Sequence, residues 1–339
     1  MHALSLTAPQ NFERIELPEP SPPSPGEALV RVHAVGICGT DISAYLGKMP
    51  FVTYPRILGH ELGVEVLAVG DGVTNVKPGD RCSVEPYIND PTSYASRRGR
   101  PNCCENLQVL GVHTDGGMRP QFVVPARKLH PGGNLAFDQL ALVETLAIGC
   151  HAVGRSGLTP DETCLIIGAG PIGLATLEFV KLIGAKVAVA DLSASRLDFC
   201  RRQMHVEATL EPSAQVASQL REIFGGNLPD VVIDATGNPQ SMSAAFGLIA
   251  HGGRLVFVGL TGEEIHFRHS AFHRPEGTLL CSRNALPADF THIISLIESG
   301  RLDTHPWITH RCQLTDLPNQ MPTYLNPTTG VVKAMAAVT

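Results

Sequence analysis

The chain has 339 residues, 43% of them hydrophobic, and its 26 Lys and Arg against 32 Asp and Glu give a formal net charge of −6. This length and composition predict a soluble globular protein that buries a substantial core in two domains. Its pI is near 6.1 and it has no long run of Lys or Arg, so it is not expected to bind nucleic acid or anionic membranes.

The N-terminal segment is unlike a signal peptide, because residues 1–17 alternate apolar residues with Asn, Glu and Arg. The apolar region 165–190 is interrupted by glycines, Glu178 and Lys181, which favours a buried strand and helix over a membrane span. Nine cysteines are too few and too scattered for a disulfide scaffold. We therefore expect a cytoplasmic protein with reduced thiols.

The first part of the chain is predicted to form a β domain. Short apolar runs at 28–35, 63–69 and 122–125 are separated by turn signals, among them Pro25-Gly26 and the tetrapeptide at 77–80. This pattern is typical of a Greek-key or barrel-like β domain.

From about residue 161, apolar strands alternate with helical stretches. Strands are predicted at 163–167, 186–191, 230–235, 254–260 and 278–282, and helices at 171–183, 193–204, 214–224 and 239–249. This alternation predicts an α/β domain with a doubly wound parallel sheet. After a helix at 288–299, the proline-rich tail is too short to fold alone and is expected to pack on the first domain.

A glycine-rich turn follows the strand at 163–167 and opens the next helix, with the sequence Gly168-Ala169-Gly170-Pro171-Ile172-Gly173. The second strand ends in Asp191, about twenty residues beyond the glycines, which completes the fingerprint of a dinucleotide-binding domain. The glycines permit a tight turn, close approach of a pyrophosphate and close helix packing, while the helix N-terminus donates N–H groups to the phosphates. The alternative is a packing turn in which Asp191 merely caps the next helix.

The identity of the dinucleotide depends on the acid. Asp191 would accept hydrogen bonds from the adenosine ribose hydroxyls and repel the extra phosphate of NADP, so NAD is favoured. Arg196 lies one helical turn further on and could reach a phosphate. It is therefore included among the candidate cofactor-binding residues.

Three separated segments of the β domain carry Cys38, His60 and Glu144. A thiolate, an imidazole and a carboxylate together suit zinc, and three protein ligands leave one coordination position open, as catalytic zinc sites require. Taken singly, each residue also fits a structural role, as a small core residue, a turn histidine and a helix-capping acid.

In combination these residues resemble the zinc-containing medium-chain dehydrogenase/reductase superfamily, which includes alcohol, sorbitol and threonine dehydrogenases. The matching motifs are Gly36-Ile37-Cys38-Gly39-Thr40-Asp41, Gly59-His60-Glu61-Leu62-Gly63, the segment 76–82, Glu144 and the glycine fingerprint. The resemblance implies a GroES-like β-barrel catalytic domain at 1–150, completed by 289–339, and a Rossmann NAD-binding domain at 151–288. It also implies a catalytic zinc in the cleft between the domains.

The resemblance carries over further roles to matching positions. Cys38, His60 and Glu144 are expected as direct zinc ligands, and Glu61 as an extra ligand that alternates with water or substrate. Zinc would act as a Lewis acid on the substrate hydroxyl, NAD would accept the hydride, and Thr40 would relay the proton. Asp41 is expected to orient a metal-bound histidine.

Many relatives carry a second, structural zinc held by four cysteines on a lobe, which here corresponds to residues 87–104. Three of the four positions fall at Asp90, Ser93 and Ser96, and only Cys104 supplies a thiol. Because a neutral hydroxyl does not replace a thiolate, the structural zinc is predicted to be absent.

The substrate is expected to be a small polyol, sugar or sugar acid with a secondary alcohol. Tyr45, His113 and the loop 112–117 could line a polar pocket, although His113 could equally be a surface-loop residue. The competing interpretations are a zinc-free quinone or enoyl reductase and a non-catalytic NAD-binding scaffold. A homo-oligomer, dimer or tetramer, is expected by resemblance, joined through the sheet edge at 254–260 and 278–282.

Overall fold

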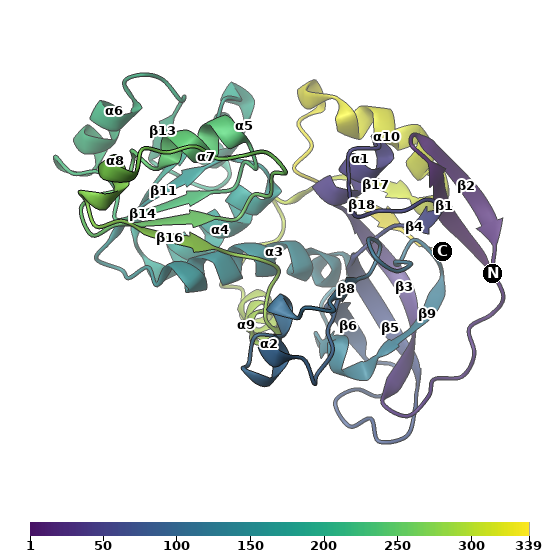
Figure 1. Ribbon diagram of the computed structural model, residues 1–339. Coiled ribbons are helices and arrows are strands. Elements are labelled where there is room, and N and C mark those ends of the chain that lie inside the picture. The colour runs from purple at the N-terminus through teal and green to yellow at the C-terminus, as the bar shows by residue number, and fades with distance from the viewer. Residues whose placement is uncertain (339) are drawn as a thin grey trace. The chain divides into compact units, whose positions relative to one another are not determined.

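The computed structural model describes residues 1–338, which divide into two compact units (Figure 1). Unit 1 comprises Met1–Glu144 together with the chain from Leu286 onward, and unit 2 comprises Thr145–Ala285. Both divisions lie a few residues before the boundaries predicted at 150 and 288. Helix α3 (Phe137–Ser156) begins in unit 1 and continues into unit 2.

Unit 1 is built on a seven-stranded sheet. Its path is β10 (Leu129–Pro131), β6 (Arg81–Val84), β5 (Glu61–Val69), β3 (Glu27–Ile37), β18 (Lys333–Ala337) and β17 (Ile308–Gln313), with β9 (Gln121–Pro125) also paired to β3. A second sheet has the order β2 (Asn11–Glu16), β1 (His2–Ala8), β4 (Arg56–Ile57). Alternate residues of β3 such as Val30 and Val32 are fully buried in one hydrophobic core, as expected of strands with one face inward.

The C-terminal segment completes this sheet. β18 pairs antiparallel with β3, with Ala334 opposite Ile37, and parallel with β17. Helices α9 (Pro287–Glu298) and α10 (Leu317–Leu325) belong to the same segment. The sequence predicted no helix at α10 because of its prolines. Pro318 lies in the first turn, where no N–H partner is needed, and the burial of Met321 and Tyr324 stabilises the helix despite Pro322 in its interior.

The smaller elements of unit 1 connect these strands. They are α1 (Gly39–Tyr45), β7 (Tyr87–Ile88), α2 (Tyr94–Arg97) and β8 (Gln108–Val109), with short 3₁₀ turns at Pro101–Cys103, Ala126–Lys128, Leu314–Asp316 and Pro327–Thr329. Gly63 on β5 lets the chain approach closely at the start of α3, since a Cβ there would lie 1.9 Å from the carbonyl oxygen of Phe137. This contact positions the helix that carries Glu144.

Unit 2 is a six-stranded parallel sheet with helices on both sides (Figure 1). The strand order is β13 (Ala208–Leu210), β12 (Lys186–Ala190), β11 (Thr163–Ile167), β14 (Val231–Asp234), β15 (Arg254–Phe257), β16 (Thr278–Cys281). The helices are α4 (Pro171–Ile183), α5 (Ala194–Arg202), α6 (Val216–Ile223), α7 (Pro239–Ala245) and α8 (His269–His273). This is the predicted doubly wound order, in which the chain reverses direction across the sheet at β11 and β14.

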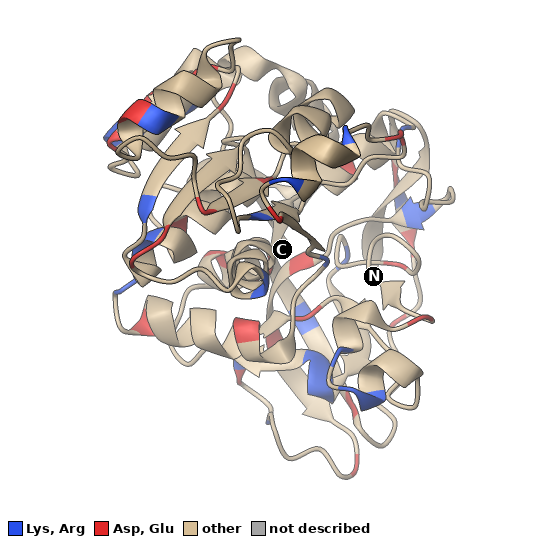
Figure 2. Ribbon diagram, turned by 60° about the vertical axis from the view of Figure 1, so that its left-hand side comes forward, with Lys and Arg blue, Asp and Glu red and all other residues tan. Residues whose placement is uncertain are grey.

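Two short elements of unit 2, β13 and α8, were not predicted, because three and five residues carry too little periodicity to be recognised. Among the described residues, no helix combines the length and apolarity that a membrane crossing requires. Lys and Arg are interspersed with Asp and Glu (Figure 2), in keeping with the absence of a long run of Lys or Arg in the sequence.

Candidate metal and dinucleotide sites

Three of the four predicted zinc ligands lie together in unit 1. The side-chain donor atoms of Cys38, His60 and Glu61 are all within 4.8 Å of one another. Cys38 is the N-cap residue of α1, and Glu61 is the first residue of β5. His60 and Glu61 are neighbours in sequence, and both reach the site because they follow a turn at Gly59, whose φ of +95° is readily adopted by glycine.

The turn before His60 is held by the predicted substrate loop. The amides of Gly116 and Gly117 donate to the carbonyl oxygens of Ile57 and Gly59, at 2.7 and 2.8 Å. A Cβ at Gly116 would lie 2.2 Å from the carbonyl oxygen of Gly59, so this close approach requires glycine. The loop thus supports the backbone that presents the histidine.

Asp41 joins the two ligand-bearing segments through their backbones. Its carboxylate accepts hydrogen bonds from the amides of Cys38 at 2.9 Å and Gly59 at 3.4 Å. Its Oδ1 lies 3.8 Å from the Nδ1 of His60, which is too long for a hydrogen bond. Burial raises the pKa of Asp41. In this structure Asp41 therefore positions the ligand backbones and does not bind the imidazole.

Glu61 is paired with a buried cation. The Lys333 Nζ donates to both carboxylate oxygens of Glu61, at 2.6 and 2.8 Å, and to the carbonyl oxygen of Ile37 at 3.4 Å. Gly36, opposite Glu61 in the β3–β5 register, makes room for the carboxylate, since a Cβ there would lie 2.0 Å from its Oε2. Sequence reasoning missed Lys333, although a lysine at the start of the apolar tail 333–338 was a signal.

Glu144 lies outside the group of three. It is buried in α3, and the hydroxyl of Tyr87 donates a hydrogen bond to its Oε1. Burial raises the pKa of Glu144, and the charge of Glu61 adds to that effect. Tyr87 was not singled out in the sequence, because nothing local to residue 87 indicates contact with residue 144.

The residues present fit a zinc ion. A thiol, an imidazole and a carboxylate supply the mixed soft and borderline donors that zinc prefers. The Nδ1 of His60 is buried and has no hydrogen-bond partner among the described residues. Burial lowers the pKa of His60, but Cys38, Asp41 and Glu144 outweigh it and hold the pKa well above its usual value. These anionic surroundings would equally stabilise a bound divalent cation.

The other predicted site residues of unit 1 are dispersed. Thr40 is half-buried in the first turn of α1, two residues after Cys38. Tyr45 is in the hydrophobic core and stacks on Phe12, with ring centroids 5.7 Å apart. His113 is half-buried, and its Nδ1 accepts a hydrogen bond from the amide of Val109 at 3.1 Å. The structure therefore places Tyr45 in the hydrophobic core, and the His113 ring bonds to the backbone four residues before it.

The lobe at 87–104 is held by hydroxyl and thiol hydrogen bonds. The Ser93 hydroxyl donates to that of Ser96 at 2.9 Å, and the amide of Asp90 donates to the Sγ of Cys104 at 3.3 Å. Within residues 1–338, a single group of three or more side chains could hold a metal ion, and it is the group that contains Cys38. The absence of a structural zinc stays a prediction.

Unit 2 contains the predicted dinucleotide fingerprint. β11 and α4 have the predicted bounds, and the turn between them begins at Gly168, whose φ is +97°. Gly170 is the N-cap of α4 and Pro171 opens the helix, followed by Ile172. A Cβ at Gly173 would lie 1.7 Å from the carbonyl oxygen of Gly168, so the turn closes only with glycine there. Such a turn leaves backbone N–H groups available to phosphates.

Asp191 follows β12 and lies against the glycine turn. Its carboxylate accepts hydrogen bonds from the amides of Ala169 at 2.6 Å and Ser193 at 2.7 Å. The Nη1 of Arg196 is 3.9 Å from its Oδ2, and the guanidinium is half exposed. The structure thus brings the predicted acid, the predicted arginine and the glycines together.

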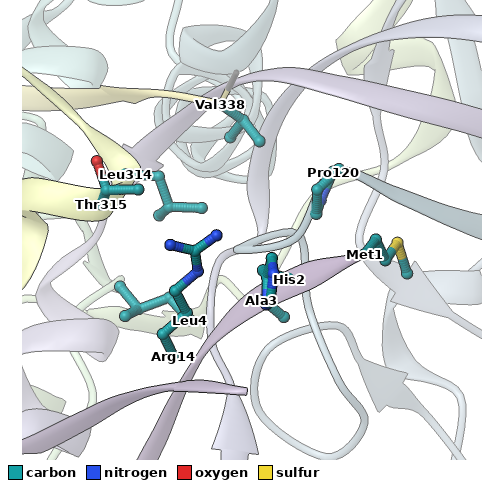
Figure 3. A pocket seen from close by; sticks show the side chains of 9 residues that line it. All are labelled: Met1, His2, Ala3, Leu4, Arg14, Pro120, Leu314, Thr315 and Val338. Atoms are coloured by element: carbon teal, nitrogen blue, oxygen red, sulfur yellow. The ribbon is translucent and has the colours of Figure 1, made fainter. Parts of the chain in front are cut away.

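A separate cavity of about 320 Å³ lies in unit 1, where the guanidinium of Arg14 points toward Leu314 (Figure 3). Met1 and Val338 also line it. None of its lining residues is a predicted site residue, so the cavity is distinct from the metal site.

Comparisons with known proteins agree with this architecture. Residues 24–134 match the family described as alcohol dehydrogenase GroES-like domain, and residues 171–299 match zinc-binding dehydrogenase. The L-galactonate-5-dehydrogenase of Escherichia coli K12 is 42% identical over 85% of both chains. Human sorbitol dehydrogenase is 33% identical over 89% of this chain and 86% of its own.

Solved structures have the same fold. An Escherichia coli CFT073 alcohol dehydrogenase (rspB), solved with NADH, superposes with a TM-score of 0.92 over 99% of both chains, at 29% identity. Two family models match in the expected order, and one relative is 42% identical. These matches establish that the chain is a zinc-dependent, NAD-linked alcohol dehydrogenase. The chain belongs to the zinc-containing medium-chain dehydrogenase/reductase superfamily.

Proposed function

We propose that this protein oxidises one secondary hydroxyl of a small polyol or sugar acid to a ketone, with NAD accepting the hydride and one proton released. The observation that carries the proposal is the convergence of Cys38, His60 and Glu61 within 4.8 Å. The substrate class is supported by two relatives, which act on L-galactonate and sorbitol according to their names.

In this proposal Cys38, His60 and Glu144 hold the zinc, and Glu61 is an additional ligand that Lys333 holds in its present position. When bound, zinc supplies a Lewis acid that polarises the substrate hydroxyl and lowers its pKa. The Thr40 hydroxyl, in the first turn of α1, accepts the released proton and passes it toward solvent.

The cofactor is bound by unit 2 in this proposal. The N-terminus of α4 and the turn at Gly168–Gly173 receive the pyrophosphate, and the Asp191 carboxylate accepts hydrogen bonds from the adenosine ribose. Because Asp191 is an anion beside the ribose site, it repels a 2′-phosphate and favours NAD. The protein acts in the cytoplasm, in keeping with nine cysteines that are all free thiols in residues 1–338.

The test is a panel of polyols, sugar acids and amino alcohols, each with NAD or NADP, followed by absorbance of the reduced cofactor. We expect turnover of polyhydroxylated substrates with NAD, and its loss in Cys38→Ser. Turnover that survives complete removal of zinc would instead support a zinc-free reductase. NADH binding without zinc binding or turnover would support a non-catalytic scaffold.

We further propose that two copies associate through the edge strand β16. β16 ends the sheet of unit 2, and Leu279 on it is 42% exposed. Exposed edge strands with apolar side chains readily pair with a second chain. Light scattering after size-exclusion chromatography should give a dimer or a multiple of it, and Leu279→Asp should shift it toward monomer. A monomeric wild-type protein would refute this assembly.

A further inference from the structure

Tyr87 has a buried contact with one of the proposed ligands. Tyr87 is 2% exposed and Glu144 is 4% exposed, and the phenol hydroxyl donates to the Oε1 of the carboxylate. Tyr87 comes from β7, 57 positions before Glu144 in the chain. A buried hydroxyl in this position restricts how the carboxylate can rotate.

The ring of Tyr87 is also held in place by packing. Phe290 of α9 contacts it edge to face, with centroids 6.4 Å apart. His130 stacks on the same phenylalanine at 4.9 Å, and its Nε2 is 3.2 Å from the Oε2 of Glu85. Glu85 also pairs with the buried Lys128. The hydroxyl of Tyr87 is therefore fixed by packing and has little freedom to leave Glu144.

The two carboxylates proposed as zinc ligands, those of Glu61 and Glu144, have partners of different kinds. Glu61 has both oxygens on the Lys333 ammonium, which neutralises its charge. Glu144 has one oxygen on a neutral hydroxyl, which orients it without neutralising it. Because Lys333 occupies both oxygens of Glu61 whereas Tyr87 occupies only one oxygen of Glu144, the second oxygen of Glu144 is better placed to bind a cation.

We infer that Tyr87 is a positioning residue that orients Glu144 as a ligand to zinc, occupying Oε1 and leaving the other oxygen to the metal. The inference rests on the proposed function, since it takes Glu144 as a zinc ligand. Hydrogen-bond partners of metal ligands characteristically fix the ligand's orientation and strengthen metal binding.

Tyr87→Phe tests this with a readout other than turnover. The change removes the hydroxyl and keeps the ring against Phe290. We expect zinc affinity, measured by competition with a chromophoric chelator, to fall about 10- to 100-fold. We also expect the visible spectrum of the cobalt-substituted protein to change. Tyr324→Phe, a buried tyrosine of α10, is the matched control and should leave both unchanged.

Glu144→Gln separates this inference from the proposed function. In that background Tyr87→Phe should change zinc affinity by less than about twofold, because the residue it acts through is already impaired. Weaker zinc binding in Glu144→Gln with wild-type affinity in Tyr87→Phe overturns the role of Tyr87 alone. Wild-type zinc affinity in Glu144→Gln overturns the ligand assignment itself. Equal effects of Tyr87→Phe in both backgrounds also refute action through Glu144.

A second variant covers the case in which Tyr87→Phe does not fold. Phe290→Leu keeps the hydroxyl and removes the ring that fixes it. We expect a smaller loss of zinc affinity in the same direction, about 2- to 10-fold. Unchanged zinc affinity and an unchanged cobalt spectrum in a folded Phe290→Leu protein would contradict the inference.

Discussion

Replacing Lys333 by methionine removes the cation that neutralises Glu61 inside unit 1. Lys333 is 2% exposed and Glu61 1%, and both carboxylate oxygens lie within 2.8 Å of the ammonium. Burial lowers the pKa of Lys333, but Glu61 and Cys38 outweigh it, so the pKa lies above its usual value and the lysine is charged. The substitution leaves a carboxylate buried without its counterion.

The expected loss is about 3–5 kcal/mol in the free energy of unfolding, the range for breaking a buried ion pair by removing one partner. Because small domains are stable by only about 5–15 kcal/mol, a loss of this size is readily measured. Lys333→Met/Glu61→Gln should recover most of it, since the remaining amide carries no charge. Lys77→Met, at an exposed lysine, should change stability by less than about 0.5 kcal/mol.

The assay is urea unfolding of zinc-free protein followed by tryptophan fluorescence. The chain has a single tryptophan, Trp307, which is 1% exposed and lies in unit 1, so its signal reports on the unit that contains the ion pair. A loss below about 1 kcal/mol in Lys333→Met would refute the reasoning. A double variant no more stable than Lys333→Met would also refute it.

Three further predictions concern the cofactor, the metal and the space around the site. Asp191→Ala should lower the ratio of kcat/KM for NAD to that for NADP at least about 10-fold, and an unchanged ratio would contradict the assigned role. Elemental analysis should find about one zinc per chain, lost in Cys38→Ser and retained in Cys104→Ser; two tightly held zincs would contradict the missing structural site. Gly36→Ala should destabilise unit 1 by about 1–3 kcal/mol, because its Cβ would lie 2.0 Å from a carboxylate oxygen on the paired strand. Gly39→Ala, with open space around it, is the control for urea unfolding, and equal stability of the two variants would count against steric exclusion.

The features that the sequence determined by itself are local ones. β11 and α4 have the predicted bounds because an apolar strand, a glycine turn and a helical period follow one another directly over residues 163–183. The ligand candidates Cys38 and His60 could be identified because each lies in a short motif with a recognisable pattern. Among the elements that the sequence did not predict, β13, α8 and α10 are short or contain prolines, and packing decides their conformation. The long helix α3 was also not predicted, because its residues 140–147 are all buried and therefore show no polar face at helical spacing.

Only the tertiary structure decided which side chains meet. Lys333 reaches Glu61 from 272 positions along the chain, because β18 pairs with β3 and β3 pairs with β5. Tyr87 reaches Glu144 in the same way, from a two-residue strand to the middle of α3. Neither contact leaves a periodic or motif signal, because a side chain's partner across a core is set by strand register and helix placement. The sequence therefore determined the chemical kinds of residue at the site, and the fold determined which carboxylate is neutralised and which one is only oriented.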